Sequence, residues 1–238
     1  MKIIPFKTRI FREGEDLFTF ITERTTRIRE SSVLVVTSKI VALSERRTAE
    51  IRNEKTRERL IKAESDWAMR AGDIWLTSKN GAMMSSAGID ESNARGKVIL
   101  LPKDGFGSAR ALWRKLKRHY GVRRLGVLIT DSRRIPFRRG IFAVAVGYAG
   151  FRGLRDSRGK PDIFGRKLKA AVTNVADSLA TAAVLLMGEG REQRPLALIQ
   201  NAPVEFTDGP LSSQELVVEP RDDLYGHLFK KRRGASRR

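Results

Sequence analysis

Short apolar runs and longer amphipathic stretches alternate along this chain of 238 residues. Runs of aliphatic and β-branched residues that stop at polar or turn-forming positions predict strands. The expected strands span residues 33–36, 73–76, 97–101, 125–130, 142–146, 196–199 and 215–218. Four other segments predict helices through helical spacing of apolar residues or charged, helix-like composition. These expected helices span residues 14–28, 54–70, 107–119 and 167–187.

The ends of these helices carry further signals. The first helix has three acidic residues at its first turn, Glu13, Glu15 and Asp16, which suit a helix N-terminus. Ser108 is a plausible N-cap for the third. Strands and helices interleave without the regular alternation of a doubly wound fold. The pattern therefore predicts an α+β fold, with mixed sheets and packed helices in two lobes.

Length and composition narrow the class of protein. The chain is long enough for one large domain or two joined lobes, and we expect a domain over residues 1–229. The absence of cysteine excludes disulfides, thiolate metal sites and a cysteine nucleophile. No apolar run reaches the roughly 20 residues that span a bilayer, and the N-terminus lacks a signal-peptide core. We therefore expect a cytoplasmic protein without a membrane segment.

Charge is the most unusual property of the composition. The chain has 47 basic and 27 acidic residues, for a net charge of +20. Residues 230–238 hold six basic side chains and no acid, which predicts a disordered basic tail. Without them the charge is still +14. Such a balance suits polyanionic small substrates or nucleic acid, but an arginine-rich genome with no specific partner explains it equally well.

The strand expected at 125–130 ends at Asp131 and runs into a basic loop with four arginines, Arg138 among them. A carboxylate at the end of a buried strand, beside arginines, is one way to hold a metal and phosphates. Asp131 also suits the ordinary capping of a turn. Asp177 lies close to the buried face of the last helix. Burying its carboxylate there costs free energy unless it is paired with an arginine or bound to a metal.

Other polar side chains follow or separate predicted strands. Ser38 and Lys39 lie where the strand at 33–36 ends, and there a hydroxyl and an ammonium group can meet a phosphate. The cluster Asp90, Ser92 and Asn93 has side chains that bind phosphates or metals. A solvated lysine and a simple turn are the alternative interpretations. No P-loop, GxSxG, HExxH or zinc-finger spacing occurs.

Taken in order, a set of motifs resembles the family of coenzyme F-420-0:γ-glutamyl ligases over residues 3–224. They are VVTSKIV (35–41), AGIDESN (87–93), LPKD (101–104), ITDS (129–132), PFRRG (136–140), VGYAG (146–150), GKPD (159–162), FGR (164–166), AD (176–177), LA (179–180) and MGE (187–189). No single motif is specific, but the ordered set is.

The resemblance implies a GTP-dependent ligase, with ATP as the other possible nucleotide, that needs Mg²⁺ or Mn²⁺. Such an enzyme joins L-glutamate to a carboxyl group of an anionic cofactor, F-420-0 or a folate-like acceptor, through an acyl phosphate. The fold would have two intertwined subdomains in a homodimer. By motif match, Asp131 and Asp177 are metal ligands, and Ser38 and Lys39 line the nucleotide site. The resemblance also suggests substrate or phosphate contacts for Asp90, Ser92, Asn93 and Arg138.

The sequence departs from the family pattern at four places. Ala42-Leu43 replaces Ser-Lys, and Glu45-Arg46-Arg47 replaces Glu-Gly-Arg. Arg134-Ile135 replaces Gly-Arg before the proline, and Ser178 replaces the second acid of an Asp-Glu pair. These changes resemble a bacterial side branch named for γ-glutamate ligation in folate metabolism. The two other hypotheses are a nucleic-acid-binding protein, motivated by the basic tail, and a protein on the same scaffold that has lost its catalytic activity.

Overall fold

The computed structural model describes residues 1–219 and 221–226, so the expected basic tail lies outside the described residues. In chain order the elements are β1 (Lys2–Phe6), α1 (Leu17–Thr22), β2 (Ser32–Thr37), α2 (Ser38–Ser44), β3 (Thr48–Ala49), α3 (Glu54–Ala63), β4 (Trp67–Ala71), β5 (Ile74–Lys79), β6 (Ala82–Ser85), η1 (Ser86–Gly88), β7 (Val98–Ile99), α4 (Gly105–Tyr120), β8 (Leu125–Arg133), β9 (Phe142–Ala149), β10 (Leu154–Asp156), β11 (Val172–Asn174), α5 (Val175–Met187), β12 (Leu196–Gln200) and η2 (Ser213–Glu215).

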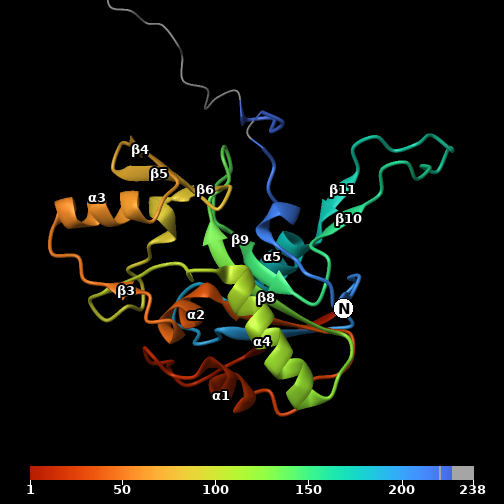
Figure 1. Cartoon of the computed structure of the whole chain (residues 1–238), viewed down its shortest axis with the longest axis horizontal. Coiled ribbons are helices and arrows are strands. Elements are labelled where there is room, and N and C mark those ends of the chain that lie inside the picture. The colour runs from red at the N-terminus through yellow and green to blue at the C-terminus, as the bar shows by residue number, and fades with distance from the viewer. Residues whose placement is uncertain (220, 227–238) are drawn as a thin grey trace, which may run out of the picture.

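A five-stranded sheet with the order β1-β12-β2-β8-β9 forms the centre of the molecule (Figure 1). β2 and β8 are parallel, whereas the other three pairs are antiparallel. Three small sheets, β4-β5-β6, β3-β7 and β10-β11, accompany it. The α+β class with mixed sheets is therefore confirmed. Among the described residues, no helix is both long enough and apolar enough to span a membrane.

Both faces of the central sheet are buried, and the alternation of side chains divides the core in two. Along β2, Leu34 and Val36 pack into one cluster with α1, α2 and α4. Val33 and Val35 point to the other face and pack with α5. A strand covered on both faces needs apolar residues at every position, which explains the continuous run from Val33 to Val36.

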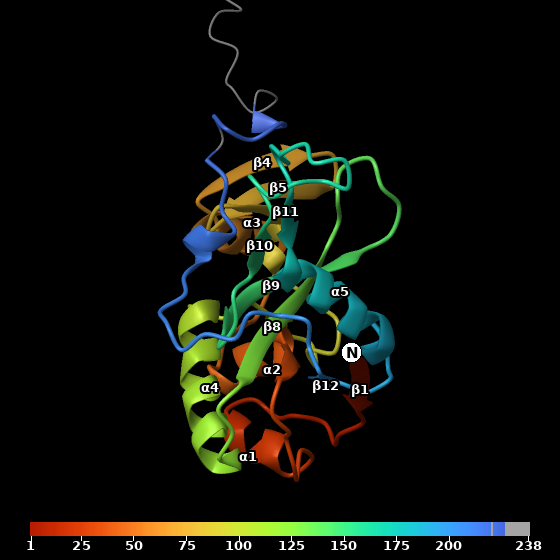
Figure 2. The ribbon, with the colours of Figure 1, turned by 90° about the vertical axis from the view of Figure 1, so that its right-hand side faces the viewer.

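The smaller sheet β4-β5-β6 and helix α3 lie together at one end of the molecule, and α1 lies at the other (Figures 1 and 2). A long loop between β10 and β11 projects from the body (Figure 1). The apolar side chain of Trp75 on β5 is buried, and Ile61 of α3 is fully buried.

Three expected helices are shorter than the pattern predicts. α1 begins only at Leu17, because the Asp16 side chain caps it by accepting from the backbone N–H of Thr19 at 2.8 Å. α3 ends at Ala63, and the rest of the expected helix pairs as β4 with β5. α5 begins at Val175 behind the Asn174 cap, since residues 172–174 pair with β10 instead.

Strand predictions also need correction. Residues 215–218 form no strand: a 3-10 turn spans Ser213–Glu215, and irregular chain follows it. The strand expected at 97–101 shrinks to β7. The sequence analysis missed β1, which pairs with β12, because its Pro5 and neighbouring charges obscure the pattern. The cap of α4 is Asp104 rather than Ser108, with its carboxylate 2.9 Å from the N–H of Gly107.

Two glycines allow α4 to lie directly on β9. A Cβ atom at Gly147 would stand 2.1 Å from the carbonyl oxygen of Gly105, and one at Gly105 would stand 2.2 Å from the carbonyl oxygen of Val146. These are backbone atoms that cannot rotate away. The missing side chains therefore fix the depth at which α4 packs, and with it the wall of a pocket described below.

Candidate functional site

A pocket of about 620 Å³ lies at the carboxyl ends of β2 and β8. Because these strands are parallel and Thr37 pairs with Thr130, both chains leave the sheet at the same edge. α2 then delivers Ser38 and Lys39 to the pocket, and β8 delivers Asp131. We call this cavity the strand-end pocket.

Asp131 and Ser38 are in direct contact in this pocket. The Ser38 hydroxyl donates to Oδ1 of Asp131 at 3.0 Å, and Ser38 is 5% exposed. Burial raises the pKa of the Asp131 carboxyl above its ordinary value, and the positive charge of Arg133 only partly opposes this. A carboxylate with one hydroxyl partner and little water is poised to accept a cation.

Lys39 lies beside the polar cluster of residues 90–93. Its Nζ is 2.7 Å from the Asp90 carboxylate and 2.7 Å from the Ser92 hydroxyl. Burial acts to raise the pKa of Asp90, but the hydrogen bonds from Lys39 and from the Ser92 backbone N–H hold it below its ordinary value. Asn93 also lines the pocket. The structure thus brings together Ser38, Lys39, Asp90 and Asn93 with Asp131, while Ser92 reaches them through Lys39.

Asp177 lines a different cavity. Its Oδ1 accepts from the backbone N–H of Ala145, and its Oδ2 accepts from the Asn174 side chain, both at 2.7 Å. It faces a pocket of about 820 Å³ between α4, the β8–β9 hairpin and the chain after residue 210. We call this cavity the hairpin pocket. Arg138 is exposed in the hairpin loop and lines neither pocket.

The described residues offer a metal ion no cage of carboxylates. Among the described residues, no group of three or more histidine or acidic side chains is arranged to hold an ion. Mg²⁺, however, is commonly held by one or two carboxylates, with waters and substrate phosphates completing its shell. Asp131, with the Ser38 hydroxyl, fits that pattern. Asp177 fits it less well, because both of its oxygens already accept hydrogen bonds and it lies in the other pocket.

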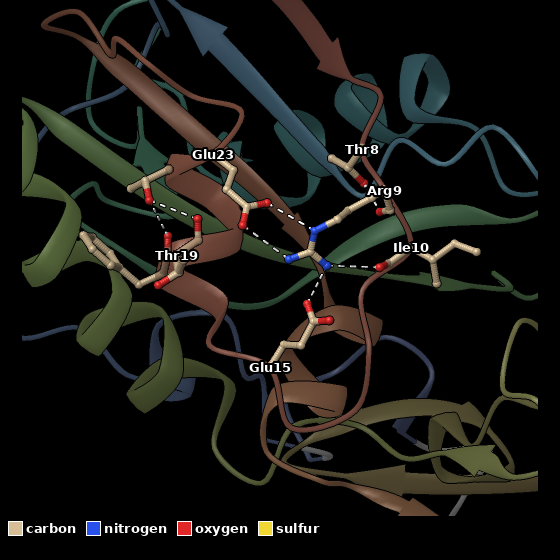
Figure 3. Close-up of polar contacts among 8 residues, drawn as sticks. Thr8, Arg9, Ile10, Glu15, Thr19 and Glu23 are labelled. Atoms are coloured by element: carbon tan, nitrogen blue, oxygen red, sulfur yellow. Dashed lines mark hydrogen bonds and ion pairs between the residues drawn. The ribbon is translucent and has the colours of Figure 1, made fainter.

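The sequence analysis did not assign two walls of the strand-end pocket. One is the segment from Thr8 to Phe11. Figure 3 shows the Arg9 guanidinium between two carboxylates, with Nη1 2.6 Å from Glu15 and Nε 3.3 Å from Glu23. These ion pairs fasten the segment to α1. The three charged residues lie in the loop before α1 and at the end of that helix, with no recognisable spacing, so this wall carried no sequence signal.

The other wall runs from Met187 to Pro195, after α5. Within it, Glu189 accepts a hydrogen bond of 2.7 Å from the hydroxyl of Ser132, the neighbour of Asp131. The MGE motif at 187–189 was the available signal for this wall. Its contact ties the end of α5 to the end of β8.

Known proteins resemble this chain over most of its length. The family model described as F420-0:Gamma-glutamyl ligase matches residues 54–201. The coenzyme F420:L-glutamate ligase of Methanopyrus kandleri is 33% identical, over 93% of this chain and 95% of the relative. The protein of that name from Archaeoglobus fulgidus is 30% identical over 93% and 94%. Its counterpart from Methanococcus maripaludis strain C7 is 37% identical over 70% of this chain and 66% of the relative.

Proposed function

The chain belongs to the F420-0:γ-glutamyl ligase family, and we propose that it is a nucleotide-dependent ligase for L-glutamate. In this proposal the amino group of glutamate forms an amide with a carboxyl group of an anionic acceptor, F420-0 or a folate-like cofactor. The names of the relatives support the amino acid and the acceptor class. The excess of basic residues suits the reaction, since all three substrates are anions.

One observation carries the proposal: an ammonium group and a half-buried carboxylate face the same pocket. Lys39 has three donors, of which Asp90 and Ser92 accept two, so the third is available to a phosphate. Asp131 lies across the pocket with the Ser38 hydroxyl. A site for nucleotide phosphates needs a cationic donor and a hydroxyl for the phosphates, and an acid for the metal ion that accompanies them.

The proposed reaction has two steps. An oxygen of the acceptor carboxylate attacks the terminal phosphorus of the nucleotide, the new O–P bond forms, and the nucleoside diphosphate leaves. The glutamate nitrogen, after losing its extra proton to solvent, attacks the acyl carbon. Phosphate leaves with the original carboxylate oxygen, and the nitrogen loses a second proton to solvent to give the amide. Lys39 would hold the transferring phosphate in place, close to the acceptor carboxylate.

Mg²⁺ or Mn²⁺ belongs to this proposal through Asp131. When bound, the ion would supply positive charge to the phosphate oxygens. The Ser38 hydroxyl, now donating to Asp131, would keep that carboxylate oriented. Asp177 is proposed as a ligand only by family resemblance, and it would first have to release the Ala145 N–H and the Asn174 amide.

We also propose that the protein is a homodimer. The register of β4, β5 and β6 places Trp67, Met69, Ile74 and Met83 on one face of the small sheet. Each of these side chains is at least 37% exposed. A cluster of large apolar residues on one exposed face is typical of an interface.

Mass spectrometry of glutamate addition tests the proposed function. F420-0 and reduced folates would each be incubated with L-glutamate, a divalent metal, and GTP or ATP in parallel. A product heavier by one glutamyl residue, formed only with a nucleotide, is expected for one acceptor. The proposal is wrong if no acceptor gains glutamate with either nucleotide. Tight, strongly salt-dependent RNA binding without turnover would then favour the nucleic-acid hypothesis.

A further inference from the structure

Arg133 is a half-buried cation whose side chain has no hydrogen-bond or ion-pair partner among the described residues. It is the last residue of β8, and its Nε atom is inaccessible to water and has no hydrogen-bond acceptor. Its guanidinium makes no other side-chain hydrogen bond or ion pair with a described residue. Asp131 and Asp177 are near enough to favour its charge, but neither carboxylate forms an ion pair with it. A guanidinium in this position is costly unless an anion reaches it.

The cavity that Arg133 faces has a surplus of free positive charge. Lys79 and Arg110 line the hairpin pocket but are already bound, to Glu64 and to the Leu211 carbonyl. Three other lining cations, Lys103, Arg133 and Arg134, have no side-chain partner within the part of the chain that the structure describes.

The acidic side chains of this pocket have more hydrogen-bond partners than its basic side chains. Asp104, Asp177 and Asp223 also line it. Each accepts a backbone N–H, from Gly107, Ala145 and Tyr225 respectively. The remaining wall is largely apolar, with Met84, Leu101, Phe106 and Leu216 among its residues. Such a cavity suits an organic molecule that carries an acid group.

The two pockets adjoin at the end of β8. Asp131 lines the strand-end pocket and Arg133 the hairpin pocket, and alternate residues of a strand point to the same side about 7 Å apart. A phosphate held in the first pocket and an acid group held in the second would therefore be close neighbours. Transfer of a phosphoryl group to a carboxylate requires that arrangement.

We infer that the hairpin pocket binds the carboxylate of an acid substrate, anchored by the terminal nitrogens of Arg133. The inference rests on the proposed function and deepens it, because it separates the acid subsite from the nucleotide subsite. The acid group can come from the acceptor or from L-glutamate. Both are carboxylates that a guanidinium can bind through two parallel hydrogen bonds.

Isothermal titration calorimetry without turnover tests this inference. Wild type, Arg133→Gln and Arg133→Lys would be titrated with F420-0 alone, L-glutamate alone and GTP alone. Arg114→Gln, an exposed position on α4 that lines neither pocket, is the matched control. We expect Arg133→Gln to lower the affinity for one of the two acids at least about tenfold. The affinity for GTP should stay within about twofold of the wild-type value. Arg133→Lys should recover part of the loss, and the control should bind like wild type.

Which acid responds identifies the occupant of the pocket. The inference is overturned if neither acid binds to wild type, if both bind to Arg133→Gln as they do to wild type, or if GTP binding falls as far as acid binding. Should Arg133→Gln fail to fold, Arg133→Lys replaces it, because lysine keeps the charge but not the fork of two parallel donors. Arg133→Lys should weaken the binding of one acid about threefold, and an unchanged affinity for both acids would overturn the inference.

This result can be distinguished from a failure of the proposed function. If acid binding depends on Arg133 but the protein never adds glutamate, the acid site is supported and the proposed ligase activity is refuted. If the protein adds glutamate but acid binding does not depend on Arg133, the ligase activity is supported and the acid site at Arg133 is refuted.

Discussion

Asp131 is a half-buried carboxylate in the strand-end pocket. It follows the apolar run of β8, and the Ser38 hydroxyl donates a hydrogen bond to it. The sequence shows the acid after the apolar run, which is why it was predicted as a site residue. The sequence does not show that Ser38, 93 positions earlier, is its partner, because the parallel pairing of β2 and β8 creates that contact.

Asp131→Asn should reduce glutamate addition at least about 100-fold, because it removes the charge available to a metal or phosphate group. The amide retains an oxygen that can accept from Ser38, so the free energy of unfolding should change by less than about 1 kcal/mol. Product formation and urea denaturation provide the two measurements. Asp73→Asn, in an exposed turn, is the control. Full activity of Asp131→Asn would refute the assignment of Asp131.

Lys39→Gln should raise the Kd for the nucleotide about tenfold, because a charged donor to phosphate is lost. Lys55→Gln, on the exposed side of α3, provides the comparison and should bind nucleotide like wild type. Nucleotide titration by calorimetry measures both. Equal affinity in the two variants would exclude Lys39 from the nucleotide site.

At the scale of the elements, local pattern predicted where the buried strands lie better than where the helices begin. The strands β2, β8 and β12 are buried on both faces, so their apolar runs are continuous. The ends of α1 and α5 depend on single caps, Asp16 and Asn174, and the residues before α5 are drawn into pairing with β10. Pairing between distant segments outweighs helical spacing, and one sequence does not reveal it.

The packing of α4 on β9 gives a prediction at this scale. Gly147→Ala should lower the free energy of unfolding by about 1–3 kcal/mol, because the new Cβ would overlap the Gly105 carbonyl. Gly190→Ala is the control, since its Cβ would have no neighbour closer than 3.4 Å. Urea denaturation measures both. A Gly147→Ala protein as stable as the control would mean that α4 packs less closely than described.

The contact between α2 and the loop after η1 should depend on pH. The pKa of Asp90 is lowered in the folded protein, so its pair with Lys39 stabilises the fold above the unfolded pKa of about 4 and is lost as the pH falls through the folded value. The Asp90 side chain is 44% exposed, so water limits the effect to below about 0.5 kcal/mol. Wild type should therefore exceed Asp90→Asn in stability at pH 7 but not at pH 3. A difference that grows toward low pH would contradict this sign.

At the scale of the whole molecule, the sequence predicted the α+β class and the family, but not the arrangement of the site. The motifs that led to the family are distributed over two cavities, with Asp131 in one and Asp177 in the other. Arg133 was passed over as one arginine of a basic loop, because only its burial distinguishes it from Arg134 and Arg138.

The exposed face of β4-β5-β6 bears on the assembly of the molecule. If it is the dimer interface, Met69→Lys and Ile74→Lys together should convert a dimer to a monomer, because both side chains lie on that face. Light scattering after size-exclusion chromatography measures the mass. A wild-type monomer, or a dimer that the double substitution leaves intact, would rule out this interface.

The most direct test of the proposed ligase follows one oxygen atom. The acceptor carboxylate would be labelled with ¹⁸O, and the inorganic phosphate released during glutamate addition would be analysed by mass spectrometry. Activation of the carboxylate as an acyl phosphate predicts one ¹⁸O atom in each phosphate released, with amide product formed in equal amount. Amide product accompanied by unlabelled phosphate would contradict the account.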